Sequence, residues 1–293
     1  MDDRLRSAYR RCRAETRRAA RNFYWAFITL PRGRREAIYA VYSLFRRWDD
    51  IADSASSPVE KRRALEEQRE IIRMLYHEDL HTCTLAHLDD DPVLLAVSDV
   101  IGRYQIPRRY FEDVLAGIEL DLHKRRYRTF EELREYCYGV ASAVGLISLE
   151  IFGYRDPVAR EYAIDLGIAM QLTNILRDIK EDLERDRVYL PLEELERFGY
   201  SKEELQKQVV NDNFRELMRG QVARAREYFA WGHRLLRYLP LRSRPCPAVL
   251  AGLYRHILDK IEARGYDVFN DRISLTSREK LATLLWAPLE GLL

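Results

Sequence analysis

The chain has little glycine, proline and cysteine: its 293 residues include 13 Gly, 10 Pro and 4 Cys. So little glycine and proline excludes a collagen-like or low-complexity chain. The cysteines are far apart and form no Cys-x-x-Cys pair, which predicts reduced thiols rather than a disulfide framework or a zinc site. The six histidines are scattered, so neither zinc chemistry nor a Ser-His-Asp triad has local support. No glycine-rich phosphate loop is present, so we expect no ATP and no Rossmann-bound nucleotide.

The net charge is close to zero: 49 Lys+Arg and 47 Asp+Glu give +2. A dedicated nucleic-acid-binding protein carries a strongly basic field, so we expect no nucleic-acid partner. The apolar content of 47% excludes a disordered chain. No run reaches the ~18 uncharged apolar residues that cross a membrane, since the best run, 136–149, ends at Glu150. The first residues lack the apolar core of a signal peptide, so we expect a cytoplasmic protein.

Helical spacing dominates what the sequence does contain. Apolar residues recur every three or four positions, as in Leu94, Val97 and Ile101, whereas strand-like alternation with Asn-Gly or Asp-Gly turns is absent. Short breaks with Pro or Gly predict roughly ten helices joined by short loops. None of these breaks is long enough to be a linker, and no internal repeat is visible. We therefore predict an all-α protein with one domain over residues 1–293.

Carboxylates gather on one face of a predicted helix near residue 50. At about 100° per residue, a narrow arc of this helix holds a tyrosine, an arginine and two aspartates, with a third aspartate at its edge. These residues are Tyr42, Arg46, Asp49, Asp53 and, at the edge, Asp50. Like charges four residues apart destabilise a helix by ~0.2–0.5 kcal/mol, so helix formation does not favour this pattern. Taken alone, the cluster is equally well interpreted as a solvated helix face.

A second polar face lies between residues 171 and 182. Its members follow at i, i+3, i+7 and i+11, with Arg177 beside them. They are Gln171, Asn174, Asp178 and Asp182. Mg²⁺ takes oxygen ligands such as these and completes its shell with water and substrate phosphates. One Asp-x-x-x-Asp pattern is weak, but two on amphipathic helices, each beside an arginine, predict two acidic faces that hold a metal–diphosphate across a cavity.

Small residues fill the segment 136–147 between the two acidic helices. One interpretation is close helix packing. The other is that small side chains leave room for a long apolar substrate, and that the ring of Tyr136 stabilises a carbocation. The sequence leaves both interpretations open.

Five stretches of the chain resemble the squalene/phytoene synthase family of head-to-head trans-isoprenyl diphosphate synthases. They are 22–27, 40–53, 136–145, 171–182 and 187–191. The second acidic motif followed by Arg187-x-Tyr189-Leu-Pro191 is highly specific. The resemblance implies a single-domain isoprenoid synthase fold, a helical bundle around a central apolar cavity. It also implies a diphosphate-releasing prenyltransferase, in which Mg²⁺ holds two prenyl diphosphates and the allylic cation of one is attacked by the double bond of the other.

The same resemblance implies roles for the matched residues. The metal ligands are Asp49, Asp50, Asp53, Asn174, Asp178 and Asp182. The catalytic residues are Asp49, Asp53, Asp178, Asp182 and Tyr136. The substrate-binding residues are Arg46, Tyr42, Gln171, Asn174, Arg177, Asn22, Phe23, Val140, Val144 and Gly145.

Details of the sequence favour different branches of the family. Asn22-Phe23 and the stretch 49–53 resemble the bacterial hopanoid-pathway branch, which makes hydroxysqualene from presqualene diphosphate. The segment 145–154 and the second acidic motif, 171–182, instead resemble the presqualene diphosphate and phytoene branches. We expect a squalene-type product from farnesyl diphosphate through a presqualene-type cyclopropyl intermediate. Phytoene synthesis from geranylgeranyl diphosphate, hydroxysqualene synthesis and, in another class, a non-catalytic helical assembly factor are the alternatives, and the use of NADPH stays open.

Two terminal segments bear on partners. Residues 4–21 hold eight arginines, which suit an anionic lipid or a phosphate, although a solvated basic face is the plainer interpretation. Residues 279–293 are apolar enough to lie on a membrane, but core capping is the plainer interpretation of so short a helix. We expect a prenyl diphosphate substrate and no obligate protein partner, and we leave peripheral membrane contact open.

Overall fold

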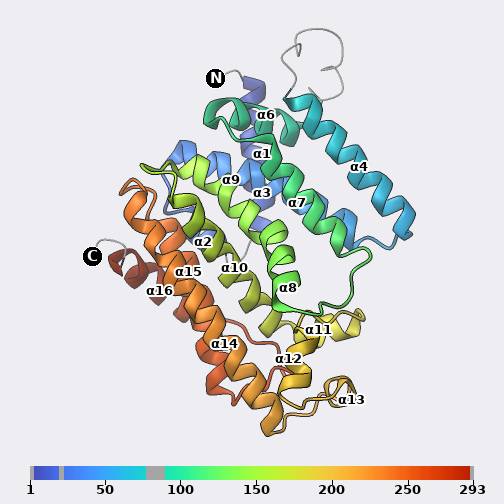
Figure 1. Ribbon diagram of the computed structural model, residues 1–293. Helices are drawn as coiled ribbons and strands as arrows, with labels where there is room; N and C mark the ends of the chain where they lie inside the picture. The colour runs from blue at the N-terminus through green and yellow to red at the C-terminus, as the bar shows by residue number, and fades with distance from the viewer. Residues whose placement is uncertain (1–2, 20–22, 77–89, 291–293) are drawn as a thin grey trace.

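Helices make up most of the structure, a computed structural model that describes residues 3–19, 23–76 and 90–290 (Figure 1). The helices are α1 (Asp3–Ala19), α2 (Phe23–Phe27), α3 (Arg32–Asp53), α4 (Pro58–Leu75), α6 (Pro92–Tyr104), α7 (Arg108–Leu120), α8 (Phe130–Cys137), α9 (Ala143–Phe152), α10 (Ala159–Arg177), α11 (Ile179–Glu184), α12 (Leu192–Arg197), α13 (Lys202–Gln206), α14 (Asp212–His233), α15 (Pro245–Ala263) and α16 (Ser277–Glu290). A π-helical turn, η1 (Tyr138–Ser142), joins α8 to α9, and a 3₁₀ turn, η2 (Arg234–Tyr238), follows α14. Within the described ranges no strand forms, and an isolated β-bridge pairs Arg126 with Val188. The all-α prediction is confirmed.

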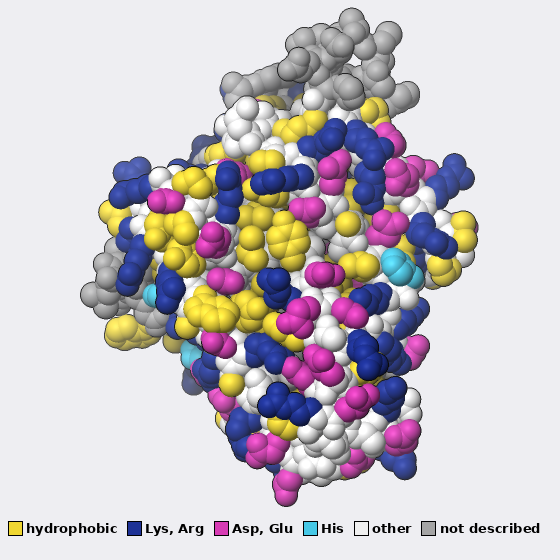
Figure 2. All heavy atoms as spheres, viewed as in Figure 1, with side chains coloured by type: hydrophobic (Ala, Val, Ile, Leu, Met, Phe, Trp, Pro, Cys, Tyr) yellow, Lys and Arg dark blue, Asp and Glu magenta, His cyan; other side chains and the backbone are white. Residues whose placement is uncertain are grey.

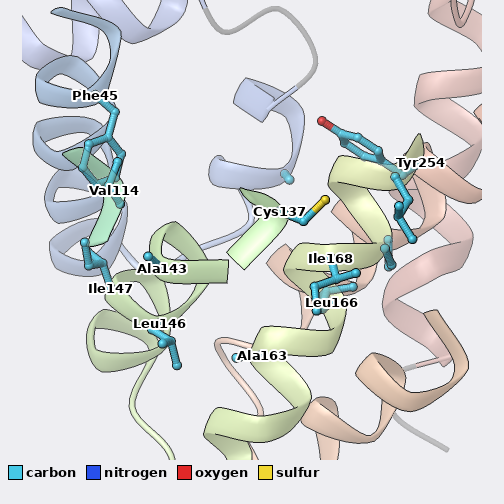
Figure 3. Close-up of a cluster of buried hydrophobic side chains, with 14 of the residues drawn as sticks. Phe45, Val114, Cys137, Ala143, Leu146, Ile147, Ala163, Leu166, Ile168 and Tyr254 are labelled. Atoms are coloured by element: carbon cyan, nitrogen blue, oxygen red, sulfur yellow. The ribbon is translucent and has the colours of Figure 1, made fainter. Parts of the chain in front are cut away.

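The bundle is built around α10, which packs against α9, α14 and α15 (Figure 1). Buried apolar side chains form one continuous cluster from Ala8 in α1 to Ala287 in α16. Figure 3 shows part of it, where Phe45 of α3 and Val114 of α7 lie on one side and Leu166 of α10 on the other. The prediction of a single domain over the whole chain stays a prediction.

The three cysteines in the described part of the chain, Cys12, Cys137 and Cys246, are buried free thiols. Burial raises the pKa of the Cys12 thiol to about 12 and also raises the pKa of the other two thiols. These cysteines therefore stay protonated near neutral pH and pack as small apolar residues. Cys83 lies outside the described residues.

The two acidic motifs lie on helices of different shape. The first motif ends α3, a helix of 22 residues. The second was expected on one continuous helix face, but α10 ends at Arg177 and α11 begins at Ile179, because Asp178 leaves the helical region (φ −104°, ψ 18°). Backbone hydrogen bonds still pass through the break, since the Asp182 N–H donates to the Asp178 carbonyl over 2.9 Å. The chain therefore bends at Asp178 without separating Asp178 from Asp182.

Close helix packing explains many of the small residues near η1. A Cβ on Gly139 would lie 2.8 Å from the Cα of Gly117, and a Cβ on Gly167 would lie 2.6 Å from the Cα of Ser142. Real Cβ atoms do not come so close, so these contacts require glycine. The run Phe130–Phe152 is long and apolar enough to cross a membrane, but more than half of its apolar window is buried in the protein. We interpret it as a core helix.

Candidate active site

Both acidic motifs face one cavity of about 590 Å³. α3 contributes Tyr42, Phe45, Arg46, Asp49, Ala52 and Asp53. The second motif contributes Gln171, Asn174, Ile175, Arg177, Asp178 and Asp182. The two motifs are ~130 residues apart in sequence, so the fold produces the opposed acidic faces that the helical patterns predicted. We call the part of the cavity lined by Asp49, Asp53, Asp178 and Asp182 the acidic mouth.

An apolar cavity of about 200 Å³ continues from the acidic mouth. The two spaces share wall residues, including Phe23, Phe27, Val140 and Val144. Beyond them the lining is almost wholly apolar, from α9, α10 and α15. Gly145 lines only this apolar cavity. A ligand with a charged head and a long hydrocarbon tail matches this change from acidic to apolar walls.

One described site residue, Asp50, is absent from the lining of the cavity. It pairs with Arg46 over 2.6 Å and lines a shallow depression with Arg47, Glu60 and Lys61. Residue 50 is offset by about 100° from residue 49 on the helix, and its role as a metal ligand stays a prediction. Asn22 lies outside the described residues.

Burial and like charges shape the first motif. The pKa of Asp49 rises to about 6, first because burial disfavours the carboxylate and then because Asp53, Asp50 and Asp121 repel it, although Arg46 opposes the shift. Asp53 is half exposed, and its nearest cation is Arg185 at 3.8 Å. This motif therefore holds negative charge that the surrounding arginines neutralise only in part.

Arginines neutralise the two aspartates of the second motif, Asp178 and Asp182, to different extents. The Asp178 carboxylate accepts a hydrogen bond from Arg177 Nε over 2.7 Å and another from Arg272 Nη2 over 3.1 Å. Asp182 has no such donors among the hydrogen bonds of the described residues. Its pKa rises to about 7, first because of burial and then because of the charge of Asp178, with Arg187 acting in the opposite direction.

A buried network that the sequence interpretation missed stands beside the acidic mouth. Asp121 accepts hydrogen bonds from Tyr136 Oη over 3.0 Å and from Tyr189 Oη over 2.8 Å. Arg187 donates to the Asp121 carbonyl over 3.1 Å. The Tyr136 and Tyr189 rings stack with their centroids 5.0 Å apart. All four residues line the cavity.

Burial raises the pKa of Asp121, with its two tyrosine hydrogen bonds and Arg187 opposing the shift. Burial also raises the pKa of Tyr136 well above 10, with further contributions from the Asp121 charge and Tyr189. Tyr136 is therefore a neutral hydrogen-bond donor near pH 7. Sequence offered one weak signal for Asp121, which alternates with Glu119 among Ile118, Leu120 and Leu122, since an acid in an apolar run is often buried with partners.

The donor set of the acidic mouth suits a hard divalent cation. Its carboxylate and amide oxygens face one another across the cavity, and Mg²⁺ binds such oxygens. Within the described residues, no three acidic, histidine or cysteine side chains come close enough to form a metal cluster by themselves. This arrangement fits a cation that shares its coordination with a bound diphosphate rather than one enclosed by protein alone.

Comparisons with known proteins agree with this geometry. The family model for squalene/phytoene synthase matches residues 16–279. The chain is 38% identical to the 15-cis-phytoene synthase of Synechococcus elongatus over 294 residues, which cover 96% of this chain and 92% of that protein. A crystal structure of a dehydrosqualene synthase with ligand matches with a TM-score of 0.87 at 27% identity, over 97% of this chain and 96% of that chain. The squalene synthase HpnC from Alicyclobacillus acidocaldarius matches with a TM-score of 0.82 at 28% identity, over 91% of this chain and 97% of that chain.

Proposed function

This chain belongs to the squalene/phytoene synthase family of prenyltransferases, and we propose that it condenses two molecules of geranylgeranyl diphosphate head to head into a phytoene-type product. The predicted family, all-α isoprenoid synthase fold and enzymatic activity are confirmed. The preference for geranylgeranyl diphosphate replaces the farnesyl expectation drawn from the sequence. It is supported by a relative named phytoene synthase at 38% identity, whereas the solved structures with squalene-type names match at 27% and 28%.

One observation carries the proposed chemistry: a single cavity passes from four carboxylates to an apolar end. A prenyl diphosphate has its charge at one end and hydrocarbon along the rest. The acidic mouth would hold the diphosphate, through a cation, while the apolar walls exclude water that would quench an allylic cation. Arg46 and Arg177 line the mouth and are placed to contact diphosphate oxygens.

We propose Mg²⁺ as the cation. Asp49, Asp53, Asp178 and Asp182 would hold it, with Asn174 beside them. A bound divalent cation neutralises the charge that builds on a leaving diphosphate and so favours ionisation. The raised pKa values of Asp49 and Asp182 fit carboxylates that lack a countercharge. NADPH is not part of the proposal, because a phytoene-type product forms by proton loss and needs no reductant.

Tyr136 lines the same cavity as Asp49 and Val140. Its hydroxyl is fixed on Asp121. The face of a neutral aromatic ring attracts a cation. We therefore assign Tyr136 to carbocation stabilisation and Asp121 to holding that ring in place.

Product analysis tests the proposal. Purified protein with Mg²⁺ and geranylgeranyl diphosphate should release diphosphate and form a hydrocarbon with twice the carbon number of the substrate. The second candidate is a squalene-type product, which the two solved structures favour. Turnover of farnesyl diphosphate alone would support that candidate. No diphosphate release from either substrate would contradict the proposed function, and an unchanged carbon number would identify a cyclase.

A further inference from the structure

Arginines of the described chain that line the cavity differ in how firmly the protein holds them. They are Arg46, Arg177, Arg185 and Arg187. Three of them have a close acceptor on the protein: Asp50 for Arg46, Asp178 for Arg177 and the Asp121 carbonyl for Arg187. The fourth, Arg185, has no such acceptor, and no role has been assigned to it above.

The guanidinium of Arg185 keeps its hydrogen-bond donors free. Within the described residues its one ion pair is with Asp53, and the two charged groups are 3.8 Å apart. This distance is too long for a hydrogen bond, and the side chains are 59% and 53% exposed. An ion pair that is so exposed contributes little to stability. Arg185 can therefore leave Asp53 at little cost.

The turn that carries Arg185 is held by the chain segment after α7. Arg185 directly follows α11, and its carbonyl accepts a hydrogen bond from Arg125 Nη1 over 2.8 Å. The next residue, Asp186, has φ +55°, which residues other than glycine rarely adopt. Arg126 donates to both the carbonyl and the carboxylate of Asp186. Such strain persists only where other contacts fix it, and it is common at ligand sites, so the main chain is fixed while the Arg185 side chain can reorient.

The pair of Arg185 and Asp53 joins the two helices that carry the acidic motifs. Asp53 is the last residue of α3, and Arg185 is the first residue after α11. Figure 2 shows acidic and basic side chains next to one another where Figure 1 places α11. A divalent cation at Asp53 would repel the guanidinium and displace it from the carboxylate. The next step rests on the proposed function, because it requires that a diphosphate binds with the cation.

We propose that Arg185 exchanges one partner for another as the acidic mouth fills. In the empty mouth it screens the carboxylate of Asp53. Once a divalent cation binds that carboxylate, the released guanidinium binds oxygens of the diphosphate. A guanidinium suits this role because it stays charged and offers two parallel N–H groups to one phosphate group.

Isothermal titration calorimetry with two probes tests this exchange. Inorganic diphosphate in excess Mg²⁺ measures the contact with diphosphate, and Mg²⁺ alone measures the contact with Asp53. Arg185→Gln should weaken binding of diphosphate with Mg²⁺ about 5- to 10-fold, because one charge-assisted contact is lost at a partly exposed site. The same variant should bind Mg²⁺ alone about two- to fivefold more tightly, because the cation no longer displaces an arginine. A general loss of structure would weaken binding of both probes.

Two further variants serve as controls. Arg185→Lys keeps the charge but loses the planar fork, so it should bind Mg²⁺ alone within about twofold of wild type and should recover only part of the affinity for diphosphate. Lys180→Gln removes a cation of α11 that is absent from the cavity lining. It should change neither affinity by more than about twofold, because screening limits each charge to its near surroundings.

The outcomes separate this inference from the proposed function. Unchanged diphosphate affinity in Arg185→Gln, weaker binding of Mg²⁺ alone, or an equal loss in Lys180→Gln would overturn the inference. The proposed function would still stand if the wild type releases diphosphate from a prenyl substrate. A wild type that binds neither probe and releases no diphosphate would overturn both. Should circular dichroism show that Arg185→Gln does not fold, full wild-type affinity for diphosphate in Arg185→Lys would overturn the inference.

Discussion

The acidic mouth and the wall behind it are stabilised in opposite ways. In the mouth, Asp49 and Asp182 lie near other carboxylates, and desolvation within the cavity raises their pKa values to about 6 and about 7. In the wall, where α7, η1 and α10 meet, backbones pack so closely that a Cβ on Gly139 or Gly167 would lie only 2.8 or 2.6 Å from the facing Cα atom. The mouth keeps charge that destabilises the ligand-free protein, and the wall supplies tight packing. Substitutions in the mouth should therefore affect turnover, and substitutions in the wall should affect stability.

The largest expected effect is the loss of turnover in the mouth. Asp178→Asn, like Asp49→Asn, should lower the rate of diphosphate release about 10³-fold or more, because it removes charge that would hold the cation against the leaving group. Circular dichroism should show an unchanged fold. Activity within tenfold of wild type would show that these carboxylates do not hold the cation.

A substitution in the wall should instead lower stability more than it lowers turnover. Gly167→Ala places a methyl group 2.6 Å from the Cα of Ser142, and such overpacking lowers the free energy of unfolding by about 1–3 kcal/mol. Urea denaturation measures this loss. Turnover at a temperature where the variant is folded should change less than in Asp178→Asn, and unchanged stability would refute the close packing of α10 on η1.

A third variant should gain stability while it loses activity. Ionisation of Asp182 is harder in the folded state, where its pKa is about 7, than in the unfolded chain, where an aspartate has its ordinary pKa of about 4. The stability penalty is absent below about pH 4, grows as pH rises to about 7 and stays constant above. Asp182→Asn without Mg²⁺ should therefore raise the free energy of unfolding by about 1–2 kcal/mol at pH 8, with a smaller gain at pH 5.

Asp53→Asn is the control for this charge effect, because Asp53 is half exposed and solvent screens its charge. Denaturation at the two pH values should show little difference between Asp53→Asn and wild type. An Asp182→Asn gain that does not depend on pH would contradict the role of ionisation.

The smallest expected effect comes from a glycine outside the wall. Gly102 lies in α6, and a Cβ there meets nothing within 4 Å. Gly102→Ala should therefore raise the free energy of unfolding by about 0.5–1 kcal/mol, because alanine has the higher helix propensity. It serves as the matched control for Gly167→Ala, and a loss of stability here would mean that glycine substitution is harmful for reasons other than close packing.

Sequence patterns predicted the parts of the site that lie on one helix. Tyr42, Arg46, Asp49 and Asp53 reach the cavity together because α3 is a regular helix in which residues three and four apart share a face. Asp50, which the same reasoning placed at the edge of the arc, is absent from the cavity lining. Helical spacing also did not reveal the bend at Asp178, since one non-helical residue leaves the periodic pattern intact.

Tertiary contacts determine the part of the site that the sequence did not predict. Asp121 follows α7, while Arg187 and Tyr189 lie more than 60 residues later. The β-bridge between Arg126 and Val188 holds the two segments together. No local period links these positions, because the pairing depends on how two irregular segments meet. In the segment 136–147, Gly139 packs closely on Gly117 and Val140 lines the cavity, so close packing is confirmed and room for a substrate stays a prediction.

The π-helical turn η1 determines which residues of the following helix, α9, face the cavity. A π turn holds about one residue more than an α turn, and η1 lies between Tyr136 and Val144, which both face the cavity. Deletion of one residue within η1 would restore regular helix and rotate everything after it by about 100°. Val144 and Gly145 would then turn away while Tyr136 stayed in place. The alignment of the Tyr136 ring with the apolar wall thus depends on a single extra residue in one turn.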